Sequence, residues 1–167
     1  MTFLPAQSPR VLYDSRGLSY GPGLPRVIVT ASRDHPRPEA VRRALDETLA
    51  ELGPFLLVHG NCPTGGDAYA DAWSLDHQND GVRVWRENAE WTRDCDTDCY
   101  HAPRTRDGEN FCPAAGPIRN RKMVSDGAAR CLGFPFGKST GTRGCMKLAD
   151  DAGIPVLEYP ITYGEAR

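Results

Sequence analysis

The chain alternates short apolar runs with longer segments in which apolar residues recur at helical spacing. Apolar runs at 27–29, 55–58, 82–85, 131–134 and 154–159 have the length and composition of buried strands. Segments at 38–52, 67–78, 116–128 and 141–151 have the length and spacing of helices. In the first of these, Val41, Leu45 and Leu49 share one helix face, Pro38 suits the first turn, and Gly53 follows the last.

Strands that alternate with helices of this length predict an α/β fold. The expected architecture is a small doubly wound, Rossmann-like, mainly parallel sheet of about five strands, covered by helices on both faces. We expect this domain at 25–167, after an N-terminal arm at 1–24 that holds one short edge strand at 11–13. In such sheets ligands bind at the carboxyl ends of the strands, beside the N-termini of helices.

The regular pattern stops between 87 and 115, and this insertion is rich in Cys, Asp and Arg. It contains a C-x3-C-x-H-x10-C pattern, formed by Cys95, Cys99, His101 and Cys112. Three thiolates and an imidazole suit tetrahedral Zn²⁺, and a long irregular loop in a compact domain needs something to order it. Four protein ligands close the coordination sphere, so the expected zinc is structural. The alternatives are a mobile loop with free thiols and a Cys95–Cys99 disulfide.

Cationic, hydroxyl-bearing and glycine residues follow the predicted strands at the points where helices begin. Their convergence on one edge of the sheet would form an anion site suited to a phosphate. The predicted ligand-binding residues are Ser32, Arg33, Gly65, Gly66, Asp67, Arg119, Asn120, Ser139, Gly141, Thr142 and Arg143. For Asp67 the alternative is a helix-start carboxylate favoured by the helix dipole.

The standard nucleotide-binding signatures are missing at these strand ends. No G-x-x-x-x-G-K-[ST] loop and no G-x-G-x-x-G turn after the first strand occurs, which disfavours a kinase-like NTPase and an ordinary dehydrogenase.

Four segments nevertheless match a known family in order and spacing. They are VIVTASRD at 27–34, LVHGNCPTGGD at 57–67, AGPIRNRKMV at 115–124 and GTR at 141–143. Over about 26–158 the chain resembles the YspA-like, YpsA-related branch of the SLOG superfamily. The resemblance implies a Rossmann-like fold that binds nucleotides or nucleotide-derived ligands. Relatives include the LOG phosphoribohydrolases, the DNA-processing protein DprA and sensor domains for nucleotide signals.

One departure from the LOG enzymes bears on the activity. Their P-G-G-x-G-T-x-x-E motif ends in a catalytic Glu, and Cys145 stands at that position here. A thiol is a poor substitute for a carboxylate that stabilises a cationic centre. The expected function is therefore binding of a phosphorylated nucleotide-derived ligand, as a sensor or sequestering protein, with no catalytic residue assigned. A nucleotide-cleaving hydrolase is the first alternative, and a DprA-like nucleic-acid module the second.

Composition narrows the class of partner. The 167 residues carry a net charge of −2, which argues against a nucleic-acid partner. No run approaches 18 apolar residues, and the start MTFLPAQSPR lacks the features of a secretory leader, so we expect a cytoplasmic protein without a membrane partner. Six cysteines in a reducing compartment favour metal ligands or buried thiols. The apolar helix faces are compatible with a homo-oligomer.

Overall fold

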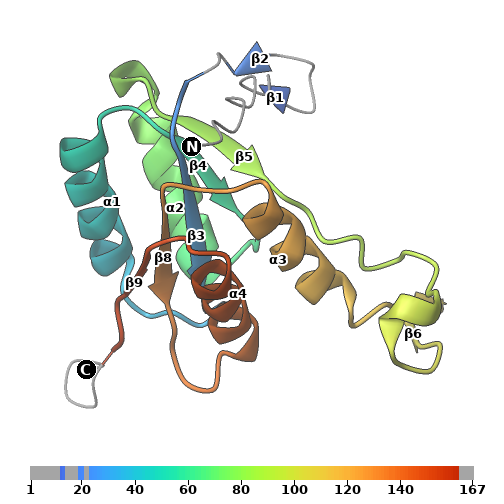
Figure 1. The fold of residues 1–167 in the computed structure, drawn as a ribbon. Helices are drawn as coiled ribbons and strands as arrows, with labels where there is room; N and C mark the ends of the chain where they lie inside the picture. The colour runs from blue at the N-terminus through green and yellow to red at the C-terminus, as the bar shows by residue number, and fades with distance from the viewer. Residues whose placement is uncertain (1–11, 14–18, 21–22, 162–167) are drawn as a thin grey trace.

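A computed structural model describes residues 12–13, 19–20 and 23–161, and its centre is a five-stranded parallel sheet (Figure 1). The sheet order is β5-β4-β3-β8-β9, and every neighbouring pair is parallel. The strands are β3 (Arg26–Ala31), β4 (Leu56–His59), β5 (Arg83–Arg86), β8 (Arg130–Phe134) and β9 (Val156–Glu158). This confirms the predicted α/β fold class.

Four helices connect these strands. They are α1 (Pro38–Leu52), α2 (Gly65–Asp76), α3 (Ala115–Ser125) and α4 (Thr140–Asp151). The bounds of α1 coincide with the prediction, whereas α3 ends earlier than the predicted 128. The reason is Gly127, whose φ of 74° turns the chain out of the helix and which donates a hydrogen bond to the Val124 carbonyl.

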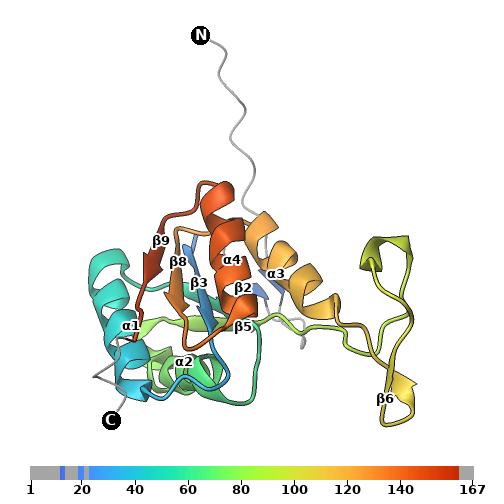
Figure 2. The same cartoon turned by 90° about the horizontal axis from the view of Figure 1, so that it is seen from below.

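The helices cover the sheet in two layers, with α1 and α2 on one face and α3 and α4 on the other (Figures 1 and 2). Successive residues of β3 serve the two layers in turn, because side chains alternate across a strand. Val27 and Val29 pack with the core beneath α1 and α2, and Ile28 packs with Met123 and Cys145 beneath α3 and α4. Both faces are therefore buried, as a parallel sheet requires.

The order of the strands reverses at β3. From β3 the chain runs through β4 to β5 on one side, and it returns to place β8 against the other side of β3. The two central strands pair along their length, from Val27 opposite Arg130 to Ala31 opposite Phe134. The loops that leave β3 and β8 diverge to opposite faces, which opens a crevice at the carboxyl ends of these strands.

The arm contributes a separate strand pair. β1 (Leu12–Tyr13) pairs antiparallel with β2 (Ser19–Tyr20), so the strand predicted at 11–13 joins a two-stranded ladder of its own. Position 11 and most of the arm lie outside the described residues. A short 3-10 helix, η1 (Gln78–Asp80), follows α2. Within the described part of the chain, no helix is long and apolar enough to span a membrane.

The insertion at 87–115 extends away from the sheet (Figure 2). It contains the 3-10 helix η2 (Thr97–Cys99) and a hairpin of β6 (Thr105–Arg106) and β7 (Glu109–Asn110). The prediction that this segment lacks regular structure was thus wrong at the hairpin. Asp107 and Gly108 form its turn with φ values of 52° and 82°, and Asp-Gly is a strong signal for a two-residue hairpin turn.

Candidate functional site

A hollow of about 890 Å³ lies at the carboxyl end of β3. The loops after β3, β4 and β8, the first turns of α3 and α4, and the insertion line it. The predicted ligand-binding residues among its lining are Ser32, Arg33, Asp67, Arg119, Asn120, Ser139, Gly141 and Thr142. This volume lies within the range of sites that hold small molecules and cofactors. Segments far apart in the sequence therefore meet around one hollow.

The N-terminus of α4 forms one side of the hollow. None of the described residues caps this helix with a side chain, and its first turn contains no acidic residue. Ser139, which precedes it, has a φ of 38°, a region that few residues other than glycine occupy, and its buried Oγ has no hydrogen-bond partner among the described residues. Arg33 and Lys138 add positive charge to the lining. Free N–H groups, the helix dipole and two cations together suit an anion.

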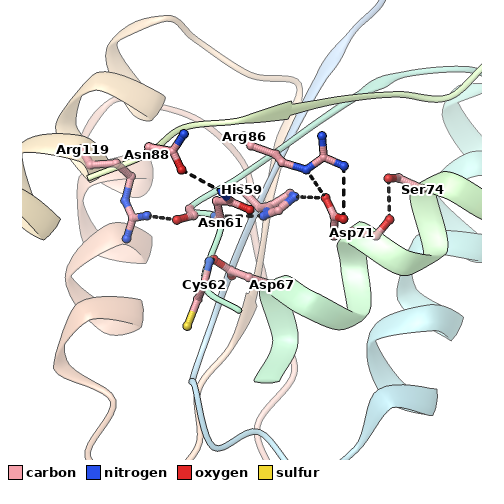
Figure 3. A network of polar contacts seen from close by, with 10 residues as sticks. His59, Asn61, Cys62, Asp67, Asp71, Ser74, Arg86, Asn88 and Arg119 are labelled. Atoms are coloured by element: carbon pink, nitrogen blue, oxygen red, sulfur yellow. Dashed lines mark hydrogen bonds and ion pairs between the residues drawn. The ribbon is translucent and has the colours of Figure 1, made fainter. Parts of the chain in front are cut away.

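The first turns of α3 tie the neighbouring loops together. Asn120 donates from Nδ2 to the carbonyl of Gly141 over 3.3 Å, and Arg119 donates from Nε to the Asn120 Oδ1 over 2.8 Å. The Arg119 guanidinium also donates to the carbonyl of Gly60 (Figure 3). A Cβ at Gly60 would overlap this guanidinium, so a side chain there would displace Arg119 from the loop. Arg119 thus holds the β4–α2 loop against α3.

Gly65 and Gly66 are not among the lining residues, and their contacts assign them a packing role. A Cβ on Gly65 would lie 2.3 Å from the Ser32 carbonyl oxygen, and one on Gly66 would lie 2.1 Å from the Cβ of Ala31. The Gly66 N–H donates to that same Ser32 carbonyl over 3.2 Å. The close approach of α2 to β3 is what brings Asp67 to the hollow.

Arg143 also lies outside the lining. It is half-exposed and forms an ion pair with Glu158 on β9, with 3.4 Å between Nη1 and Oε1. A contact between Arg143 and ligand stays a prediction.

Asp67 places a buried carboxylate in the hollow. Its side chain accepts a hydrogen bond from the Cys62 N–H over 3.2 Å, and the residue is only 5% exposed. Burial raises the pKa of this carboxyl, although nearby His59 and Arg119 act in the opposite direction. Such a group can accept a hydrogen bond from a hydroxyl or, when protonated, donate one.

A polar network supports the β4–α2 loop from beneath (Figure 3). His59 at the end of β4 is fully buried, its Nδ1 accepts from the Asn61 N–H over 3.1 Å, and its Nε2 lies 2.9 Å from Asp71 Oδ1. Because Nδ1 accepts, Nε2 is the protonated nitrogen and donates to Asp71. Arg86 donates to the same carboxylate over 2.7 Å. The hydrogen bond from His59 is the main cause that lowers the Asp71 pKa to about 2, and Arg86 adds to it.

We expect an Asp71→Asn variant to be less stable than the wild type at pH 7. On acidification its free energy of unfolding should fall less than that of the wild type. The native carboxylate has a pKa of about 2 against an ordinary 3.8, so its contribution is present above about pH 4 and disappears as the pH falls towards 2. Urea unfolding between pH 7 and pH 3 should show the gap between the two stabilities narrow. Asp76→Asn, at the exposed end of the same helix, is the control and should change stability by less than about 0.5 kcal/mol. A stability gap that stays constant over this range would contradict the expectation.

The four predicted metal ligands meet in the insertion. The ligand atoms of Cys95, Cys99, His101 and Cys112 all lie within 4.8 Å of one another. Cys99 and Cys112 are 3.6 Å apart at sulfur, and His101 Nε2 lies 3.6 Å from the Cys112 sulfur and 3.7 Å from the Cys95 sulfur. Tetrahedral Zn²⁺ with its usual bond lengths gives edges of about 3.6–3.8 Å. These three distances match a tetrahedral metal ion, and Cys95 and Cys99 do not form a disulfide.

Arg93 lies against this cluster. Its Nη1 donates to the Cys99 sulfur over 3.0 Å, and its Nη2 pairs with Asp96. A site of three thiolates and a neutral imidazole around a divalent ion carries one net negative charge, which a neighbouring guanidinium offsets.

The insertion also lines the hollow, and this was not predicted for two of its residues. Arg106 and Phe111 belong to the lining together with Trp91. Two signals in the sequence pointed to these residues. The Asp107-Gly108 turn folds the chain back directly after Arg106, and Phe111 directly precedes the predicted ligand Cys112. Neither signal indicates on its own that the hairpin faces the sheet.

Comparison with known proteins points to one family. The model of the YspA, cpYpsA-related SLOG family matches residues 25–93, which extend from β3 to the insertion. The chain is also 36% identical over 138 residues to the Gene 61 protein of Mycobacterium phage D29, and this alignment covers 80% of the chain and 95% of that protein. This alignment therefore covers most of both proteins.

Proposed function

Because the chain belongs to the YspA, cpYpsA-related SLOG family, we propose that it binds a nucleotide or a nucleotide-derived phosphorylated ligand in the hollow at the end of β3. The role that fits is that of a sensor or sequestering protein for this ligand. Membership of the family suggests a nucleotide-related ligand, and the hollow lies where doubly wound sheets bind theirs.

The N-terminus of α4 is the observation that carries the proposal. An uncapped helix start, the buried Ser139 Oγ without a partner among the described residues, and the hydroxyl of Thr142 supply donors in one place. A buried donor without a partner costs stability unless a ligand satisfies it. A phosphate group would satisfy several at once, and Arg33 and Lys138 would balance its charge. In this arrangement the Asp67 carboxylate would accept a hydrogen bond from a sugar hydroxyl.

Binding measurements on a Thr142→Val variant test the proposal. The substitution preserves shape, and we expect it to weaken binding of nucleoside monophosphates about tenfold or more, because a hydrogen bond to a charged phosphate is lost. Thr48→Val is the matched control, since Thr48 is buried in α1, outside the lining of the hollow, and donates to the Ala44 carbonyl of its own helix. Isothermal titration calorimetry with a panel of nucleoside monophosphates gives the affinities, and mass spectrometry of extracted ligand identifies what co-purifies. Wild-type protein that binds no nucleoside phosphate would refute the proposal.

A second candidate function is cleavage of the bound nucleotide, and Asp67 is the observation that favours it. A carboxyl whose pKa is raised by burial is suited to general acid catalysis at the edge of a binding site. Cys145 is not suited to replace the Glu of the LOG enzymes, because it is fully buried and burial raises its thiol pKa. Release of free base or ribose 5-phosphate that disappears in Asp67→Asn would support cleavage. Unchanged nucleotide after prolonged incubation would leave binding as the function.

We also propose that Cys95, Cys99, His101 and Cys112 hold a structural Zn²⁺. The ligand types and the tetrahedral edge lengths support this metal, and four protein ligands leave no open position for a substrate. The ion would cross-link the insertion.

A further inference from the structure

Aromatic and cationic side chains form one wall of the hollow on the side of the insertion. The rings of Trp91 and Phe111 are nearly parallel, with 9° between their planes and 5.8 Å between their centroids. Arg106 places its guanidinium carbon 3.8 Å from the centroid of Phe111, and Arg33 places its own 5.8 Å from that of Trp91. All of these side chains line the hollow.

Backbone contacts hold this wall in place. The Cys112 N–H donates to the Trp91 carbonyl over 2.7 Å, and the Phe111 N–H donates to the Arg104 carbonyl over 2.9 Å. The Trp91 indole lies against Gly116 in the first turn of α3, where a Cβ on Gly116 would come within 3.2 Å of the ring. The wall is therefore attached both to a metal ligand and to the helix that carries Arg119.

We propose that the wall formed by Trp91 and Phe111 binds the heterocyclic base of the ligand, so that the hollow selects base-bearing nucleotides over sugar phosphates. This inference rests on the proposed function, because it takes the other end of the ligand to be the phosphate held at α4. Rigid aromatic rings offer a stacking surface to any nucleobase at little cost in entropy. The Arg33 guanidinium lies near the outer limit of cation–π contact, about 6 Å, so it can leave the indole when a base arrives.

The family's matched region accounts for only part of this wall. Trp91 lies at the end of residues 25–93, and both Arg106 and Phe111 lie beyond it. Base recognition would therefore come from the metal-ordered insertion, while phosphate recognition would come from the sheet loops. One hollow would thus combine base recognition by the insertion with phosphate recognition by the sheet loops.

The test compares four nucleoside monophosphates, AMP, GMP, CMP and UMP, with ribose 5-phosphate. We expect the best of the four to bind the wild type about 5- to 100-fold more tightly than ribose 5-phosphate, because stacking of a base on an aromatic ring has that effect. Trp91→Ala should remove this advantage and change the affinity for ribose 5-phosphate by less than about twofold, and Trp91→Phe should retain most of it. The nucleotide should also quench tryptophan fluorescence in the wild type and in Trp85→Phe, whose indole is not among the lining residues, but not in Trp91→Phe.

The possible outcomes distinguish the base wall from the proposed function. Ribose 5-phosphate that binds as tightly as every nucleotide would overturn the base wall and leave the proposed function intact. Equal loss of both ligands in Trp91→Ala, with the quenching absent in the wild type, would show that Trp91 only supports the fold, and would overturn the inference. If none of the five compounds binds the wild type, the proposed function fails and the inference fails with it. A metal content and melting temperature for Trp91→Ala that match the wild type ensure that the variant is folded.

Discussion

Protein stripped of the proposed zinc, or a Cys112→Ser variant, is expected to lose the ordered structure of the insertion while the five-stranded sheet stays folded. The insertion has a very small core of its own, in which Cys99, Cys112 and Ala115 are the buried residues. Two of these three belong to the proposed metal cluster, so without the ion little apolar burial remains to order the insertion. Apparent binding free energies of structural zinc sites, about 10–16 kcal/mol in small peptides, show how much order such an ion can supply.

The sheet should survive because its two cores contain no residue of the insertion among their buried members. Limited trypsin digestion gives a sensitive measurement, since Arg104 and Arg106 lie in exposed parts of the insertion and should be cleaved much faster in the metal-free protein. Elemental analysis should find about one zinc per chain in the wild type and well under one in Cys112→Ser. Cys62→Ser, at a cysteine outside the cluster, should keep its metal. Equal resistance to trypsin with and without metal would show that the insertion orders itself.

Adding a single methyl group at Gly66 is expected to destabilise the whole domain by at least about 3 kcal/mol, which corresponds to a fall in melting temperature of roughly 6–12 °C. The new Cβ in Gly66→Ala would lie 2.1 Å from the Cβ of Ala31, far inside van der Waals contact. Ala31 ends the central strand β3 and pairs there with Phe134 of β8, which limits how far it can move away. The start of α2 would have to separate from the sheet instead.

A second substitution at Ala31 tests whether its contact with the new methyl group is the cause of the lost stability. Removing the opposing methyl group in an Ala31→Gly, Gly66→Ala double variant should restore much of the lost stability, because the close contact is between these two positions. Gly144→Ala is the control. A Cβ there meets nothing within 4 Å, and alanine in an exposed helical position should raise stability by about 0.5–1 kcal/mol. Thermal unfolding of the four proteins checks the series. A double variant no more stable than Gly66→Ala would show that the methyl contact is not the cause.

Local patterns were sufficient for most of the secondary structure. Helix α1 begins at Pro38 and ends before Gly53 as predicted, because its apolar positions and both end signals lie within one short segment. The alternation of strands and helices also identified the parallel sheet, since the apolar runs of the central strands β3, β4 and β8 are buried on both faces. The hairpin in the insertion was readable from Asp107-Gly108, but the surrounding irregular composition obscured it.

The residues that line the hollow were harder to predict from the sequence. Gly65 and Gly66 have the composition of a phosphate loop, and only the position of Ala31 and Ser32 beneath them reveals a packing role. Phe111 lies far along the chain from Arg33, and no periodic pattern relates them. Their meeting in one hollow depends on how the insertion leaves the sheet, which is a long-range property.

The amino-acid sequence alone determined the α/β class, the four residues that cluster as candidate metal ligands and the loops in which an anion site would lie. These features depend on periodicity and residue spacing within short segments, where neighbouring residues act directly on one another. The order of the strands, the close approach of α2 to β3 and the aromatic wall were decided by tertiary structure. They depend on side chains from distant segments that meet only when the whole sheet is packed, so no local pattern records them.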